Sequence, residues 1–99
     1  MSEFGSVLVV ADGVVGTSGK PIRITAIHIL SGGTAGEVKL YNGISNGGTL
    51  YVQELCTVVS TGNRFSYGEE GILFPNGCYY EEVTDSNVTS TLITFEKEP

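Results

Sequence analysis

The chain has 99 residues, with 11 acidic and 5 basic side chains, one His, two Cys and no Trp. This length allows one domain (residues 1–99) with one modest core, and it leaves no room for a cofactor domain beside a catalytic one. The charged fraction of 16% is too low for a disordered polyelectrolyte. The 14 Gly follow no G-X-Y period, which excludes collagen.

The formal net charge of −6 argues against two classes of partner. Nucleic-acid binding needs a clustered basic face, and anionic membrane surfaces attract the same kind of face. The basic residues instead stand singly along the chain, at Lys20, Arg23, Lys39, Arg64 and Lys97. We therefore expect no nucleic-acid partner and no membrane partner.

The N-terminal sequence favours synthesis without secretion. The longest apolar run, Val7 to Ala11, is far shorter than the roughly 20 residues that span a bilayer. Glu3 stands where a signal peptide carries basic residues, and no adequate apolar segment follows. We therefore interpret the glycosylation sequon at Asn87 as fortuitous. We expect Cys56 and Cys78 to be reduced, buried thiols, with one disulfide as the alternative.

Short strands separated by turn residues run through the chain. Val, Ile and Thr number 11, 7 and 10, against 3 Ala, which favours strands over helices. The expected strands are Ser6–Asp12, Ile22–Leu30, Glu37–Tyr41, Thr49–Val59, Arg64–Tyr67, Ile72–Phe74, Cys78–Val83 and Val88–Glu96. Residues 1–5 are expected to be a flexible N-terminus. The spacing predicts an all-β single domain, an antiparallel β-sandwich of jelly-roll or Ig-like type with seven to eight strands.

Turn residues predict two hairpins. Asn42-Gly43 and Pro75-Asn76-Gly77 supply the φ angles that tight turns need. The expected hairpins join Glu37–Tyr41 to Thr49–Val59 and Ile72–Phe74 to Cys78–Val83.

Alternation assigns faces to several strands. Val38 and Leu40 share one face, and Glu54 interrupts the apolar face of its strand. The segment Ile22–Leu30 is apolar on both sides, which predicts either a central strand or a strand beneath a subunit contact. The residues from Val7 to Val10 are expected to form an edge strand, which pairs either within its own sandwich or with another protein subunit.

His28 is the only histidine, and it lies between Ile27 and Ile29. Catalytic imidazoles need an orienting carboxylate and a nucleophile, and the chain has no G-x-S-x-G elbow. We expect a hydrogen-bonded structural histidine, with catalysis or metal binding as the alternatives.

Three acidic segments and one glycine-rich segment resemble chemical motifs. Adjacent strand residues point to opposite faces, so Glu81 and Glu82 cannot share a substrate. Glu69-Glu70 lies between two glycines in a loop, where a cation site is the alternative to solvated carboxylates. Asp85-Ser86-Asn87 lacks the Gly and Glu of a calcium loop, which predicts a turn. Gly32–Gly36 lacks the P-loop lysine, so we expect a flexible hairpin connection. We assign no catalytic, cofactor-binding or metal-binding residue and expect no enzyme.

The aromatic side chains have two interpretations. They either fill the core and the sheet surface, or they expose a glycan-stacking platform or a protein interface. The residues are Tyr41, Tyr51, Tyr67, Tyr79, Tyr80, Phe65 and Phe74.

Three segments carry a resemblance to a known class of proteins. They are Ile24–Gly36 (ITAIHILSGGTAG), Val38–Gly43 (VKLYNG) and Gly71–Tyr80 (GILFPNGCYY). Over residues 20–95 the chain resembles small β-rich virion structural proteins of tailed bacteriophages. The resemblance implies a β-sandwich or jelly-roll-like module on the outside of the particle, with no catalytic residues. The chain lacks a trimerisation stalk, which favours a compact decoration protein over a fibre.

The resemblance leads to a functional expectation. The chain is expected to be a capsid decoration (cement) protein, made in the host cytoplasm and located on the outer capsid surface of the virion. Its partners would be the major capsid protein lattice and further copies of itself, as a dimer or trimer. The alternatives are a head or tail fibre or a glycan-binding host-attachment module, and then a small hydrolase.

Overall fold

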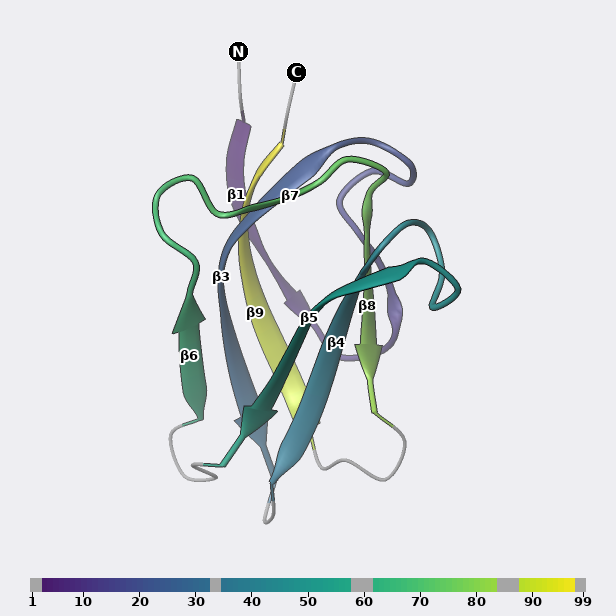
Figure 1. The fold of residues 1–99 in the computed structure, drawn as a ribbon. Coiled ribbons are helices and arrows are strands. Elements are labelled where there is room, and N and C mark those ends of the chain that lie inside the picture. The colour runs from purple at the N-terminus through teal and green to yellow at the C-terminus, as the bar shows by residue number, and fades with distance from the viewer. Residues whose placement is uncertain (1–2, 33–34, 58–61, 84–87, 98–99) are drawn as a thin grey trace.

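The computed structural model describes residues 3–32, 35–57, 62–83 and 88–97, and every regular element within these ranges is a β-strand. The strands are β1 (Glu3–Val9), β2 (Gly13–Val15), β3 (Ile22–Ser31), β4 (Gly36–Asn42), β5 (Thr49–Cys56), β6 (Asn63–Ser66), β7 (Ile72–Phe74), β8 (Cys78–Glu82) and β9 (Val88–Lys97). Sheet A has the order β1-β9-β3-β6, with β7 also paired to β3, and sheet B has the order β2-β8-β4-β5. The two sheets pack face to face as a sandwich (Figure 1).

The strand pairs are nested like those of one long hairpin. Strand β1 pairs with β9, β2 with β8, β3 with β6 and β7, and β4 with β5, all antiparallel. Folding this hairpin into two sheets also places β9 beside β3 and β8 beside β4. This order is that of a double-sheet jelly roll. The expected all-β sandwich is confirmed. The Ig-like form is excluded, because the first two strands of an Ig domain lie in one sheet, whereas β1 and β2 lie in different sheets.

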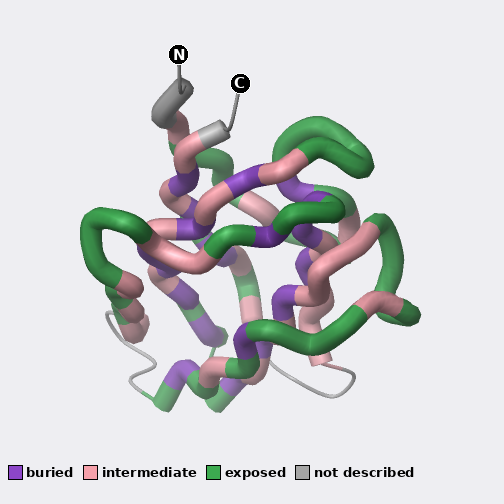
Figure 2. The backbone as a smooth tube through the Cα atoms, turned by 45° about the horizontal axis from the view of Figure 1, so that its top comes forward, coloured by how far each residue is buried: buried purple, intermediate pink, exposed green. Residues whose placement is uncertain are grey.

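The core lies between the inward faces of the two sheets. Val38 and Leu40 of β4 are fully buried, as their alternation predicts. Tyr80 and Phe74 are the largest of the fully buried side chains. Buried segments follow the strands, and exposed segments lie mainly in the connections (Figure 2). The core therefore consists of alternate strand residues from both sheets.

A β-bulge explains why β3 is apolar on both sides. Ile22 and Ile24 are buried, the register with β9 shifts between Ile24 and Ala26, and Ile27 and Ile29 are then buried in turn. A bulge adds one residue and so transfers the following side chains to the other face. Strand β3 lies between β9 on one side and β6 and β7 on the other. The expectation of a central strand is confirmed.

Strand β2 lies outside the strands that the sequence predicts, in the segment between Asp12 and Ile22. Gly13–Val15 pairs with β8, and Val15 is buried. The described chain therefore has nine strands where seven or eight were expected. Strand β1 also starts earlier than expected. The segment from Glu3 to Gly5, expected in a flexible N-terminus, pairs with the end of β9.

One of the two expected hairpins is confirmed. Strands β4 and β5 pair antiparallel, with a bulge after Leu40, while Val58 and Val59 lie outside the described residues. The second expected hairpin is wrong. Strand β7 pairs with β3 in sheet A, whereas β8 pairs with β2 and β4 in sheet B.

The turn between β7 and β8 is fastened to the end of β4. The Gly43 amide donates a hydrogen bond to the Gly77 carbonyl, and the Asn76 amide donates one to Asn42 Oδ1, both at 2.9 Å. The turn therefore carries the chain from sheet A to sheet B. Phe74 enters the core from sheet A, and Cys78 enters it from sheet B.

Candidate functional site

His28 lies on the outer face of sheet A and not in the core. Its cross-strand neighbours are Leu92 on β9 and Arg64 on β6. The β3 bulge places it there, because Ile27 and Ile29 on either side point inward. Neither neighbour is a carboxylate or a nucleophile, so the arrangement offers no catalytic dyad across the strands.

The two adjacent glutamates of β8 point to opposite faces, as expected. Glu81 accepts hydrogen bonds on the outer face of sheet B. Glu82 accepts a 3.3 Å hydrogen bond from the buried Tyr80 hydroxyl, and its backbone amide donates one to Asp12 Oδ1 at 2.8 Å. Burial raises the pKa of Glu82. The two carboxylates therefore do not form a shared acid–base pair.

The remaining motif candidates lie in connections between strands. Glu69 and Glu70 are exposed in the turn between β6 and β7. The segment Gly32–Gly36 links β3 in sheet A to β4 in sheet B, so it is an inter-sheet connection and not the expected hairpin. Gly33 and Thr34 within it, and Asp85–Asn87, lie outside the described residues.

Cys56 and Cys78 are both buried free thiols, as expected. Cys56 pairs with Gly36 at the start of β4, and Cys78 pairs with Asn42 at its end. These positions are six residues apart along β4, a distance of roughly 20 Å, which is too far for a disulfide. The Cys56 thiol donates to the Ile29 carbonyl at 3.2 Å, and burial raises the pKa of Cys78 to about 12.

The described residues bring no three His, Cys, Asp or Glu side chains together in a group that could hold a metal ion. In the same part of the chain, no helix has the length and hydropathy of a membrane-spanning segment.

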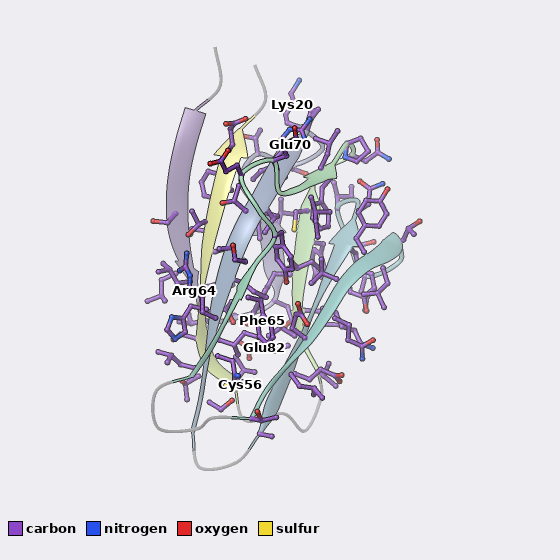
Figure 3. The ribbon with its side chains drawn as sticks, turned by 60° about the vertical axis from the view of Figure 1, so that its left-hand side comes forward. Lys20, Cys56, Arg64, Phe65, Glu70 and Glu82 are labelled. Carbon is purple, nitrogen blue, oxygen red and sulfur yellow. The ribbon has the colours of Figure 1, made fainter. Side chains whose placement is uncertain are left out.

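The aromatic residues divide between the core and the surface. Tyr80 and Phe74 are buried in the core, and Phe65 and Tyr67 pack against it. Figure 3 shows Phe65 pointing into the space between the sheets and its neighbour Arg64 pointing away from it. The remaining tyrosines, Tyr41, Tyr51 and Tyr79, are partly or largely exposed.

An apolar surface, here called the leucine face, lies on the outer side of sheet A. Leu8, Leu92, His28 and Arg64 form one row across β1, β9, β3 and β6, and Leu30 lies beside this row. Leu8 is 59% exposed, and Leu30 and Leu92 are each 39% exposed. These five residues include no carboxylate, although the chain carries a net charge of −6.

A second surface, here called the tyrosine face, lies on the outer side of sheet B. Val14, Tyr79, Tyr41 and Leu50 form a row across β2, β8, β4 and β5. A polar row runs beside it, formed by Glu81, Lys39 and Gln53. The tyrosine face therefore combines an apolar strip with a parallel strip of charged and amide groups.

Glu81 accepts side-chain hydrogen bonds on both of its carboxylate oxygens. Tyr41 Oη donates to Glu81 Oε1 at 2.8 Å, and Asn46 Nδ2 donates to Glu81 Oε2 at 3.0 Å. The hydrogen bonds from Asn46 and Tyr41, followed by the charge of Lys39, lower the pKa of Glu81. Desolvation and the hydrogen bond to Glu81 raise the pKa of Tyr41. The carboxylate is thus held ionised and oriented.

The sequence points to Tyr41 and Tyr79 as candidate surface aromatics, but it does not predict that they lie beside Glu81. Alternation along β4 and β8 is a sufficient signal for which residues face outward. That β8 lies beside β4 depends on the jelly-roll order, and local sequence carries no signal for it.

Comparison with known proteins gives no identification, because no protein-family model, no curated protein and no solved structure matches this chain significantly.

Proposed function

We propose that the chain is a non-enzymatic structural protein of a phage virion, a capsid decoration protein that binds the outer surface of the head and stabilises it. The leucine face is the observation that carries the proposal. The jelly-roll order is consistent with it by analogy, since jelly rolls occur in viral capsid domains and in lectins, although a fold alone does not define a function.

The leucine face has the properties of a protein-docking surface. Contiguous exposed apolar groups beside polar ones mark interaction sites on small domains. Arg64 supplies a positive charge and none of the five residues of the face is a carboxylate, so the face complements an apolar surface that carries carboxylates. We therefore propose the major capsid protein lattice as the partner, with avidity from many repeated copies.

The edge of sheet A offers a second contact. Among the described strands, β1 pairs only with β9. Its outward edge is thus available for strand addition, and Leu8 on β1 continues the leucine face to that edge. We propose this edge for self-association as a dimer or trimer.

Immunogold labelling of phage particles from the source, with antibody against this chain, tests the location. Gold over the heads supports decoration. Gold only on the tail supports the fibre or attachment alternative, and unlabelled particles contradict a virion location.

Co-sedimentation with heads that lack the chain tests the docking face. Leu8→Glu should abolish binding, because it places a negative charge within the apolar contact. Leu55→Glu is the matched control, since Leu55 is 53% exposed on the outer face of sheet B. Equal loss in both variants would contradict the assignment to the leucine face.

The host-attachment module is the second candidate, and the tyrosine face favours it. Exposed aromatic rings beside oriented polar groups are suited to binding glycans.

A further inference from the structure

We propose that the tyrosine face binds a carbohydrate, with a pyranose ring against Tyr79 and its hydroxyl groups held by Glu81, Asn46 and Lys39. This site lies on the opposite side of the sandwich from the leucine face. It is therefore independent of capsid docking, and both surfaces can be occupied in one molecule.

The polar part of the site is organised before any ligand arrives. An ionised carboxylate accepts about four hydrogen bonds, and Tyr41 and Asn46 supply one to each oxygen of Glu81. Each oxygen keeps a lone pair, so Glu81 can accept hydrogen bonds from two neighbouring hydroxyl groups. Hydrogen bonds to a charged acceptor are stronger than neutral ones, and a fixed carboxylate loses little freedom on binding.

The apolar part of the site is the row that contains Tyr79. Val14 is 37% exposed and Leu50 42% exposed at the two ends of this row, with Tyr79 and Tyr41 between them. A tyrosine ring provides an apolar surface with a polar end. A pyranose has the matching form, since one side presents C–H groups and its perimeter presents hydroxyls.

Other ligand classes fit the tyrosine face less well. A phosphate would meet the Glu81 carboxylate, with Lys39 as the single cation of the polar row. An added peptide strand needs free backbone groups at a sheet edge. Tyr79 and Tyr41 instead lie on β8 and β4, which are each paired on both sides.

A glycan array of bacterial surface polysaccharides, followed by two-dimensional NMR titration with methyl glycosides of mannose, galactose and glucose, tests the proposal. We expect array binding, and we expect amide shifts centred on β8, β4 and the loop that carries Asn46. Glu81→Gln should weaken binding by about tenfold or more, as expected for loss of a charged acceptor. The NMR spectrum of each variant reports whether it is folded.

Glu37→Gln is the matched control. Glu37 lies on the same face and also accepts a hydrogen bond from a side-chain amide, that of Gln53, but it lies outside the tyrosine row. Full binding by Glu37→Gln together with loss in Glu81→Gln supports the site. No binding on the array, shifts centred elsewhere, or equal losses in the two variants would overturn it. Capsid binding by Glu81→Gln should stay unchanged, which separates this proposal from the docking proposal.

Discussion

The hydroxyl groups of Tyr80 and Thr91 lie 2.7 Å apart in the core and join sheet B to sheet A by a hydrogen bond. Both side chains are fully buried. At the edge of the sandwich where β6 and β5 lie, the Tyr67 hydroxyl donates to Glu54 Oε2 at 2.8 Å. This contact explains why a carboxylate interrupts the apolar face of β5. Together with the Cys56 thiol, which donates to the Ile29 carbonyl, two tyrosine hydroxyls therefore add hydrogen bonds between sheets that pack mainly through apolar side chains.

Removing the Tyr80 hydroxyl should destabilise the fold. Tyr80→Phe leaves the buried Thr91 hydroxyl without this partner, and we expect the free energy of unfolding to fall by about 1–3 kcal/mol. Urea unfolding measures it. In the double variant Tyr80→Phe/Thr91→Val the two losses should be less than additive. Tyr79→Phe, on the outer face, should change stability by less than about 0.5 kcal/mol, and a similar loss there would contradict the prediction.

Stability should decrease at alkaline pH. Burial raises the pKa of Cys78 from its ordinary 9.0 to about 12. Burial and the hydrogen bond with Glu54 raise the pKa of Tyr67 above its ordinary 10.0, and burial raises that of Tyr80. The folded state therefore favours the protonated forms. Their contribution to the free energy of unfolding is fully present below the ordinary pKa values. This stabilisation is lost as the pH rises toward the pKa values that the groups have in the folded state.

Urea unfolding between about pH 8 and pH 11 checks this dependence, with a slope of up to ~1.4 kcal/mol per pH unit for each group. Tyr67→Phe should reduce the slope above about pH 10. A free energy of unfolding that stays constant across the range would refute the prediction.

The two thiols should be inert in the folded protein. Both cysteines are buried, and only the thiolate reacts readily with disulfide reagents. We expect almost no reaction with Ellman's reagent under native conditions and two thiols per chain in denaturant. No titratable thiol in denaturant would indicate a disulfide between the two cysteines and would contradict the placement of Cys56 and Cys78 at opposite ends of β4.

Two glycines allow backbone strain to be separated from steric overlap. Gly62 has φ +81° and Gly68 has φ +83°, a region where a side chain costs about 1–2 kcal/mol. A Cβ atom on Gly62 would lie 2.4 Å from the Ile29 carbonyl oxygen, whereas a Cβ on Gly68 meets nothing within 4 Å. Gly62→Ala should therefore lower the melting temperature more than Gly68→Ala. Thermal unfolding measures both variants. Equal decreases in their melting temperatures would show that the overlap with the Ile29 carbonyl has no effect.

Local sequence was sufficient to predict most of the strands. The strands β3, β4, β7, β8 and β9 lie close to their expected bounds, because alternation of apolar residues and glycine-rich turns act over a few residues. Strand β2 escaped detection because three residues with one glycine give no measurable periodicity. Its pairing with β8 and the burial of Val15 define it instead.

Pairing between distant strands could not be predicted in the same way. The sequence Pro75-Asn76-Gly77 is typical of a hairpin turn, yet here it crosses between the sheets, because Asn42 and Gly43 at the far end of β4 bind it. The bulge in β3 likewise follows from its register with β9. Such contacts join residues far apart in the chain, and local patterns do not specify them.

The sequence by itself determined the all-β class, the inward faces of β4 and the opposite orientations of Glu81 and Glu82, since each follows from the two-residue period of a strand. The tertiary structure decided which strands are neighbours. It placed His28 beside Arg64 on one outer face and Tyr41 beside Tyr79 and Glu81 on the other. Surfaces that can bind a partner arise from lateral strand order, which is set by the packing of the whole chain around one core.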